Sequence, residues 1–374
     1  MKKLVENKSF SQKIDSFAEM LKERNLNDFV SNFNCESGFL TSGSTTLPYT
    51  KTSMKNRKAC YTVSQMSHNY HYAKREIEIE NLGFSRFVVY PMLETLALFL
   101  RMAKIDNSIM LNNWGISTNL YPKNPNLDEF GQIIDSVLKN NKKDAIIFRS
   151  INSTTCSDLE QYLVDYGFNR IFSRNIILFP YTKLSEYKRA NRRQINRDLK
   201  LQKEHGLHWE MVDELTEEQA LRVKNLYDQL YLDKYSKYNP QFTLDYFLGT
   251  IQNEVYTFHL LYKDDEMVGV LGMFTIDGLS TNPILGYDFN QEFSDYLYRV
   301  ITSRIAIFCS EHQLRRHASS GAMEFKKLRG GISVPEYTMV YTKNLNWFRR
   351  LNWSIFRFIS IKIAKPIIMR MENS

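Results

Sequence analysis

The feature that most constrains this chain is an alternation of short apolar runs with segments of helical periodicity. Apolar runs typical of buried strands cover residues 108–114, 145–149, 171–179, 256–262, 267–276 and 283–288. Other segments have apolar residues at three- and four-residue spacing, which predicts helices at 127–139, 156–166 and 293–312. Strands that alternate with helices favour sheets covered by helices. The sequence therefore predicts a mixed α/β fold with some α+β character.

The length of the chain predicts more than one domain. A single hydrophobic core stops growing at about 250–300 residues, and this chain has 374. The two halves also repeat one order of elements: helices, a sheet, a long helix, and then a strand, a short helix and a strand. We therefore expect two tandem domains, 1–182 and 183–374, each a mixed β-sheet flanked by helices.

Composition limits the class of protein and its compartment. Hydrophobic residues make up 43% of the chain and charged residues 24%, which argues against a disordered or fibrous protein. The four cysteines form no C-x-x-C pair, so we expect free thiols and no disulfide framework. There is no apolar leader and no run of about 18 apolar residues. These features favour a cytoplasmic location.

The net charge of +8 is concentrated in two segments. Residues 183–204 hold eight Lys or Arg and three acids, and this helix is either a solvated face or a track for the phosphates of a tRNA or carrier. Residues 343–370 hold seven Lys or Arg and no acid. Their helical stripe consists of Phe348, Leu351, Ile355, Phe358, Ile359 and Ile363. The stripe either lies on a membrane surface or packs on the protein; Pro366 and the isoleucine runs favour packing.

Several motifs of the second half resemble those of a known superfamily. A basic stretch, Asn191-Arg192-Arg193-Gln194-Ile195-Asn196-Arg197, precedes Gly206-Leu207. The predicted hairpin contains Asp265-Glu266-Met267-Val268-Gly269, and Leu285-Gly286-Tyr287-Asp288 precedes a helix with Tyr296-Leu297-Tyr298-Arg299. The last motif is Ser320-Gly321-Ala322-Met323-Glu324-Phe325-Lys326-Lys327-Leu328-Arg329-Gly330. In order and spacing these motifs resemble FemAB-like proteins of the GNAT acyltransferase superfamily, over about residues 185–345.

The resemblance implies tandem GNAT-like domains that transfer an acyl or aminoacyl group to an amine. One part of the superfamily pattern is missing: the loop Q/R-x-x-G-x-G/A, which aims backbone N–H groups at the pyrophosphate of acetyl-CoA. Residues 289–294 stand there instead and contain no glycine. The expected donor is an acyl-CoA or acyl carrier protein thioester, or the aminoacyl-tRNA that FemAB-like proteins use. The expected acceptor is a small-molecule amine or amino acid.

Three residues at predicted strand ends are the candidate catalytic groups. Acyl transfer requires removal of a proton from the amine and stabilisation of the oxyanion. Asp288 and Tyr287 follow Gly286, where the chain can approach a ligand closely, and His317 precedes a run of small residues. Each also has a structural explanation: a loop cap, a core ring and a hydrogen-bonded histidine. Glu324 and Glu336 are further candidate bases.

The predicted donor- or substrate-binding residues surround the last motif. Lys326 matches the lysine that FemAB-like proteins keep near the reacting end of the donor. Arg329 suits phosphate or carboxylate recognition. The set is completed by Arg299, Ser319 and Ser320, although Ser320 also suits a helix cap.

Two groups in the first half are further candidates. His68 and His71 are spaced by three, which lets two imidazoles share one helix face. No third ligand is evident, so no metal site is expected. A second group either lines a groove between the halves or forms an ordinary loop: Asn112, Asn113, Trp114 and residues 117–119.

Three functions remain open from the sequence. The first is an N-acyltransferase that uses a thioester donor, and the second is a FemAB-like, aminoacyl-tRNA-dependent transferase that forms peptide bonds. The third is a non-catalytic module that binds a membrane surface or nucleic acid, as the basic helices suggest. The expected partners are an acyl carrier protein or tRNA, and the inner membrane face through the C-terminal basic helix.

Overall fold

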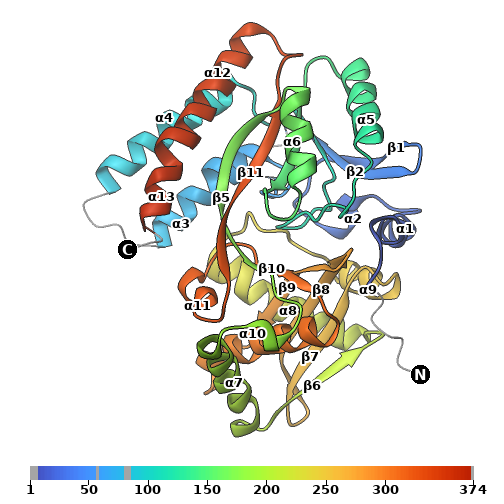
Figure 1. The fold of residues 1–374 in the computed structure, drawn as a ribbon, viewed down its shortest axis with the longest axis vertical. Helices are drawn as coiled ribbons and strands as arrows, with labels where there is room; N and C mark the ends of the chain where they lie inside the picture. Colours follow the sequence, from blue (N-terminus) through green and yellow to red (C-terminus); the bar gives the residue numbers. More distant parts are fainter. Residues whose placement is uncertain (1–6, 56–58, 80–85, 372–374) are drawn as a thin grey trace. The chain divides into compact units, whose positions relative to one another are not determined.

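The computed structural model describes residues 7–55, 59–79 and 86–371 (Figure 1). It divides into two compact units, and each contains strands covered by helices. Unit 1 contains Met1–Arg24, Asn175–Lys234 and Phe242–Val334. Unit 2 contains Asn25–Arg174, Tyr235–Gln241 and Pro335–Ser374. The predicted mixed α/β fold is confirmed.

The compact units divide the chain differently from the expected boundary after residue 182. Met1–Arg24 belongs to unit 1, and Pro335–Ser374 belongs to unit 2, so both units are discontinuous in sequence. The chain passes from one unit to the other within strands β5 (Asn169–Phe179) and β11 (Ile332–Tyr341). The tandem order of domains, 1–182 and 183–374, stays a prediction.

In unit 1 the strands follow the order β10-β9-β8-β7-β6. Their bounds are β6 (Leu207–Val212), β7 (Thr257–Lys263), β8 (Glu266–Ile276), β9 (Leu279–Tyr287) and β10 (Arg315–His317). From β6 to β9 each strand is antiparallel to the next, and β7 and β8 form the hairpin that the sequence predicts. β10 runs parallel to β9, and α10 (Ser294–Glu311) connects the two.

Different helices cover the two faces of the unit 1 sheet (Figure 1). On one face α10 packs with α7 (Arg189–Glu204), and Leu285 and Tyr287 of β9 share a core with Leu297. On the other face Gly286 lies against α8 (Glu217–Asp228). A Cβ at Gly286 would lie 2.5 Å from the backbone of Leu226, so the close approach of helix and strand requires glycine.

In unit 2 the strands follow the order β1-β2-β3-β4-β11, and β3 and β4 are parallel. The first four are β1 (Glu36–Ser42), β2 (Thr45–Thr52), β3 (Ser108–Leu111) and β4 (Ala145–Ile151). Ile147 packs in one core with α4 (Arg86–Met102) and α12 (Trp347–Phe358). Phe148 faces the other way and lies 6.2 Å, centroid to centroid, from Phe130 of α5 (Leu127–Asn140).

The remaining helices are short or flank these cores. They are α1 (Phe10–Met20), α2 (Leu26–Phe29), α3 (Ala73–Ile79), α6 (Ser157–Tyr166), α9 (Leu244–Gln252), α11 (Met323–Lys327) and α13 (Lys365–Met371). Turns of π-helix occur at η1 (Ser67–Tyr72), η4 (Gln229–Tyr235) and η5 (Ile359–Ala364), and a 3-10 turn at η3 (Leu184–Glu186). No helix in the described ranges has the length and apolar character to cross a bilayer.

Helix α4 differs from what the local sequence predicts: the run 84–90 is typical of a strand, and Pro91 suits the first position of a helix through Met102. Phe84 lies outside the described residues, but Arg86–Met102 is helical and Pro91 lies inside that helix. A proline there costs one backbone hydrogen bond. The helix instead derives its stability from Leu93, Ala97 and Leu100, which recur at helical spacing and are all buried in the unit 2 core.

Candidate functional site

The candidate site in unit 1 lies where two parallel strands separate. β9 and β10 pair only through Arg315–His317 and Leu279–Thr281. Beyond His317 the chain follows β5 instead, because Ala318 N–H donates to Ile177 O at 2.8 Å and Ile177 N–H donates to Ser319 O at 2.9 Å. Ligands of open α/β sheets bind beyond the carboxyl ends of parallel strands, where neighbouring connections diverge.

Lys326 fixes the small-residue segment that follows β10. Its ammonium is buried and donates to Ala318 O at 2.7 Å and to Ser320 O at 2.8 Å. The predicted residues Lys326, Ser319 and Ser320 are therefore brought together. Ser320 contacts the lysine through its carbonyl. Ser319 has a φ of 54°, so it adopts the left-handed conformation that redirects the chain after the strand.

A buried carboxylate that the sequence did not single out joins two predicted arginines. Asp198 of α7 is fully buried, and its two oxygens accept from Arg329 Nε at 2.6 Å and from Arg299 Nε at 2.8 Å. The Arg329 guanidinium also lies 3.4 Å from the centroid of the Phe325 ring. Two cations share one carboxylate, so the cluster keeps a net positive charge. It joins α7, α10 and the segment after α11.

A narrow pocket adjoins this cluster, and Arg316 lines it together with Lys326 and Arg329. Its cavity volume is about 10 Å³, enough for about one water molecule, and its lining is Phe179, Tyr187, Ile195, Thr302, Ser303, Ala306, Cys309, Arg316, Phe325, Lys326 and Arg329. Arg316 Nη2 donates to Asn282 Oδ1 at 3.3 Å, but its buried Nε has no hydrogen-bond partner among the described residues. Burial lowers the pKa of Arg316. A pocket with three cations and no carboxylate in its lining suits an anionic group.

An aromatic chain connects Tyr287 to the same region. The ring centroid of Tyr298 lies 6.5 Å from that of Tyr287 and 5.1 Å from that of Phe325. Tyr287 is mostly buried and shares its core with α10. The Tyr298 ring thus lies between Tyr287 and Phe325, which precedes Lys326. Both explanations of Tyr287, a core residue and a site residue, stay open.

Asp288 lies at the other end of β9 from His317. His317 pairs with Thr281, and at about 3.3 Å per residue Asp288 is roughly 20 Å farther along the strand. Its carboxylate accepts from Arg222 Nη2 at 2.7 Å and from Asn290 N–H at 2.9 Å. Burial raises the pKa of Asp288, but these hydrogen bonds outweigh burial and leave that pKa below its usual range. The carboxylate is thus ionised and a weak base.

The surroundings of His317 determine its tautomer. The ring is buried, and its Nδ1 accepts from Ser319 N–H at 3.2 Å. A neutral imidazole with Nδ1 as acceptor carries its proton on Nε2. In this state Nε2 is a hydrogen-bond donor, which suits stabilisation of a developing oxyanion better than removal of a proton. The catalytic roles of Asp288, Tyr287 and His317 stay predictions.

The two histidines of the first half do not face one site. His68 Nε2 lies 3.2 Å from Ser173 Oγ, whereas the His71 ring stacks on Tyr238 with 5.0 Å between centroids. They lie in the π-helix η1, which has more residues per turn than an α-helix, so the three-residue spacing does not align them. In the described parts of the chain no cluster of three His, Cys, Asp or Glu side chains has the arrangement of a metal site.

Unit 2 contains a buried charge cluster that sequence reasoning did not identify. Arg174 Nε donates to Glu336 Oε1 at 2.8 Å and its Nη2 to Ser117 O at 3.0 Å. Arg149 is also buried and donates to Thr62 O at 2.9 Å. Burial, together with Arg149 and Arg174, lowers the pKa of the neighbouring His68 to about 3. The candidate base Glu336 is therefore held in an ion pair, and Ser117 belongs to a buried polar loop.

Comparison with known proteins gives structural similarity without sequence similarity. No family model and no curated protein matches the sequence of the chain. The structure of L-PGS from Bacillus licheniformis is 14% identical with a TM-score of 0.48, and the match covers 71% of this chain and 96% of that chain. FemX is 14% identical with a TM-score of 0.45, over 62% of this chain and 80% of that chain.

A tandem GNAT protein from the clavulanic acid biosynthesis pathway is also similar, with 7% identity and a TM-score of 0.37 over 63% of this chain and 74% of that chain. Proteins of the GNAT class, which the sequence motifs resemble, are thus among the similar structures. Identities of 7–14% and TM-scores below 0.5 concern the fold and do not extend to activity.

Proposed function

We propose that the chain is an N-acyltransferase that moves an acyl group from an acyl-CoA or acyl carrier protein thioester to the amine of a small molecule or amino acid. One observation carries the proposal: three motifs far apart in sequence meet beside the end of β10. Asp198, on the basic helix, contacts both Arg299 and Arg329. Asn191 of the same helix donates to Leu328 O at 2.8 Å.

The separation of β9 and β10 leaves backbone N–H groups of β9 available as hydrogen-bond donors for acyl transfer. β9 pairs with β8 along one edge as far as Tyr287. Along its other edge, no strand of the described ranges pairs with β9 beyond Thr281. Backbone N–H groups on such an edge can stabilise the oxyanion of a tetrahedral intermediate, which is the charge that develops in acyl transfer. The cationic pocket beside Lys326 and Arg329 would hold an anionic part of the donor or acceptor.

The second candidate is the FemAB-like reaction with aminoacyl-tRNA as donor. The observation that favours it is the exposed basic face of α7, where Arg193, Arg197 and Lys200 are all exposed. A row of cations at helical spacing can follow the phosphates of a nucleic acid, and such binding weakens with salt. The third candidate, a non-catalytic binding module, predicts no product with any donor.

The test offers the full chain three donor classes together with a mixture of amines and amino acids, and detects amides by mass spectrometry. We expect amide from the acyl-CoA or acyl carrier protein donor, and no effect of prior ribonuclease treatment. Loss of product after ribonuclease treatment would identify the aminoacyl-tRNA reaction. No amide from any donor, with a folded chain, would contradict both transferase proposals.

A further inference from the structure

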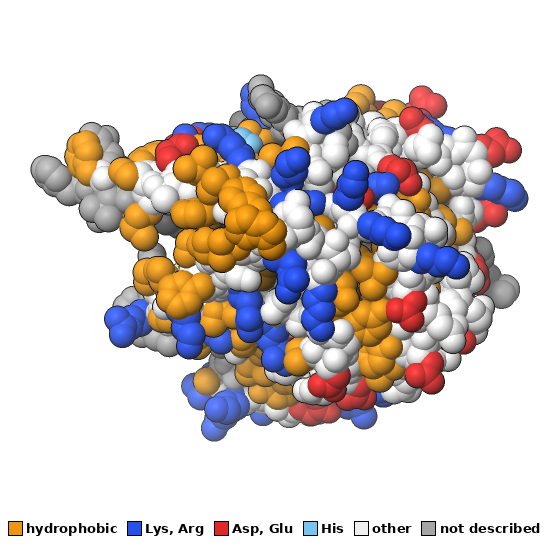
Figure 2. Space-filling model, turned by 90° about the horizontal axis from the view of Figure 1, so that it is seen from above, with side chains coloured by type: hydrophobic (Ala, Val, Ile, Leu, Met, Phe, Trp, Pro, Cys, Tyr) orange, Lys and Arg blue, Asp and Glu red, His pale blue; other side chains and the backbone are white. Residues whose placement is uncertain are grey.

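Exposed apolar side chains concentrate on neighbouring helices of unit 2. Of the fifteen large apolar side chains that are exposed in the described residues, ten lie on α4, α12, η5 and α13. They are Phe87, Met92, Leu98, Trp347, Phe348, Leu351, Phe358, Ile363, Ile367 and Met369, and they are called the apolar face below. α4 and α12 pack against one another, and Figure 2 shows hydrophobic side chains gathered with Lys and Arg beside them.

The apolar face corrects the expected packing of the C-terminal stripe. Phe348, Leu351 and Phe358 are exposed at 44%, 50% and 60%, although packing on the protein was expected for them. The helix α12 is buried through its opposite side, where Trp353 and Phe356 enter the unit 2 core. Ile355 and Ile359 are partly buried, so the outward-facing part of the stripe consists of Phe348, Leu351, Phe358 and Ile363.

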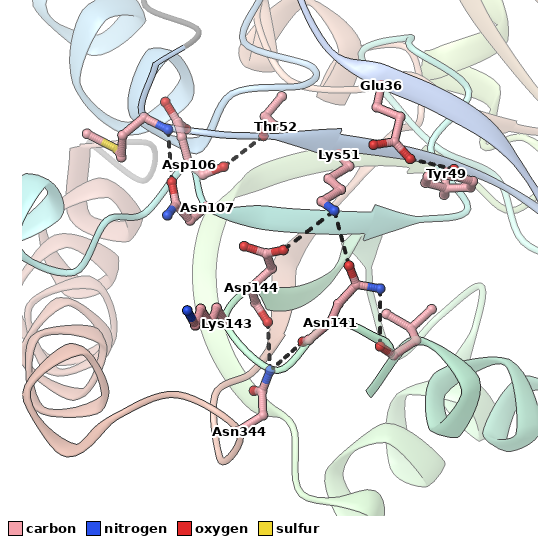
Figure 3. A network of polar contacts seen from close by, with 12 residues as sticks. Glu36, Tyr49, Lys51, Thr52, Asp106, Asn107, Asn141, Lys143, Asp144 and Asn344 are labelled. Atoms are coloured by element: carbon pink, nitrogen blue, oxygen red, sulfur yellow. Dashed lines mark hydrogen bonds and ion pairs between the residues drawn. The ribbon is translucent and has the colours of Figure 1, made fainter. Parts of the chain in front are cut away.

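Polar anchors hold α12 in place and account for this orientation. Arg349 is buried and donates to Ala103 O at 2.9 Å and to Lys104 O at 3.2 Å. Before the helix, Asn344 Nδ2 donates to Asp144 O at 2.8 Å and to Asn141 O at 3.3 Å (Figure 3). The buried arginine turns the apolar stripe of its own helix outward. Because the anchors satisfy buried carbonyls, this orientation is fixed.

Positive charge predominates along the C-terminal helices of the apolar face. Residues 343–370 contain seven Lys or Arg and no acid. Of these cations, Lys343, Arg350, Arg357, Lys362 and Arg370 are exposed. On α4 the acid Glu94 is paired with Lys74 at 2.7 Å. The surface therefore combines apolar and aromatic side chains with uncompensated positive charge.

We propose that the apolar face docks on a bilayer that contains anionic lipid. An amphipathic helix with aromatic and aliphatic residues on one face, and Lys or Arg beside them, lies in the headgroup region with its apolar face inserted. Trp347, at 73% exposure, is the residue type that interfaces favour. A second copy of the chain fits less well, because a two-fold interface would bring two copies of the same positive surface together. Docking on a bilayer is independent of the transfer reaction proposed above.

The test measures cosedimentation of the full chain with vesicles of phosphatidylcholine, alone or mixed with phosphatidylglycerol, over a salt series. We expect binding to the anionic vesicles at low salt, weaker binding as salt rises, and little binding to neutral vesicles. Equal binding to both vesicle types would contradict the proposed attraction of the cations to anionic lipid. Absence of binding at low salt would overturn the proposal, as would a stable dimer that buries this face.

Matched variants distinguish docking through the apolar face from non-specific hydrophobic or electrostatic binding elsewhere on the chain. Leu351→Ser should weaken binding about fivefold, since half of that side chain is available for insertion. Leu221→Ser, at an equally exposed leucine of α8, should leave binding unchanged. Equal effects of the two substitutions would refute the assignment of this face.

Charge reversal supplies an independent pair of variants. Arg350→Glu with Lys362→Glu should weaken binding more than about 25-fold, because each cation near an anionic surface contributes about fivefold. Arg197→Glu with Lys200→Glu makes the same change in net charge on α7 and should have a much smaller effect. A larger loss from the α7 variant would place the docking surface there and overturn the proposal. All four positions are exposed, so circular dichroism should report a native fold.

Discussion

Removal of the charge of Asp198 should destabilise unit 1 strongly. Asp198→Asn keeps the shape of the side chain, but its amide nitrogen cannot accept from either arginine. Arg329 would then lose its carboxylate while its side chain is only 10% exposed. Arg299, at 33% exposure, would be screened in part by water. Removal of one partner from a buried ion pair costs about 3–5 kcal/mol, and partial screening places the expected cost near 3–4 kcal/mol.

The matched control is an exposed ion pair in the same unit. Arg24 and Asp245 lie 2.8 Å apart, and their side chains are 41% and 52% exposed. Asp245→Asn should cost about 0–1 kcal/mol, because water solvates both ions when the pair is broken. The two substitutions make the same chemical change, so their difference measures the effect of burial.

The assay is thermal unfolding followed by circular dichroism. For a domain of about 150–250 residues, 1 kcal/mol shifts Tm by about 2–4 °C. Asp198→Asn should therefore lower Tm by about 6–16 °C, and Asp245→Asn by less than about 4 °C. Equal small shifts in both variants would refute the reasoning, since the Asp198 cluster would then contribute no more than a surface pair.

Three further predictions concern stability. Burial raises the pKa of Asp106 to about 6, against hydrogen bonds from Met66 and Ser64. Because this pKa is higher in the folded state, the protonated carboxyl stabilises the fold in acid, and that stability is lost as pH rises through about 6. Urea titrations should therefore show the free energy of unfolding of wild type falling by about 2 kcal/mol relative to that of Asp106→Asn between pH 4 and pH 7. Asp288 should show the opposite pH dependence, because its pKa is lowered in the folded state and its carboxylate stabilises the fold above about pH 4. In urea titrations, the free energy of unfolding of wild type should therefore fall toward that of Asp288→Asn as the pH is lowered below about 4. Gly286→Ala should cost more than about 1–3 kcal/mol in urea unfolding because its Cβ would meet helix backbone. Gly269→Ala meets side chains at 3.3 Å and should cost less; a reversed order would contradict this account of the β9–α8 contact.

Periodicity predicted the fold well wherever one face of an element is buried. The helices expected at 127–139 and 293–312 are α5 and α10 within about two residues. Periodicity failed where tertiary contacts override a local rule. Pro91 suits a first helical position, yet the core contacts of Leu93 and Ala97 keep it inside α4. The apolar stripe of α12 was expected to be buried, but Arg349 selects the other face.

The candidate site could be predicted only in part. The motifs indicated Lys326, Arg329 and Arg299, and the structure brings these three to one region. Asp198 was missed, although it shares a helical face with the buried Ile195. An acid on the buried face of a basic helix indicates a buried ion pair and could have been predicted from the helical spacing. Glu336 was a candidate base, but its ion pair with Arg174 could not be predicted, because the two residues lie far apart in sequence.

The most direct test of the central claim compares two adjacent lysines in the transfer reaction. Lys326 is buried and holds the segment after β10, whereas Lys327 pairs with the exposed Glu324 at 2.8 Å. A displacement of about 1 Å at a reaction site can cost about a hundredfold in rate. The kcat/KM for amide formation should fall at least about tenfold in Lys326→Met and less than about twofold in Lys327→Met. Full activity in a folded Lys326→Met would contradict the claim that acyl transfer takes place beside the end of β10.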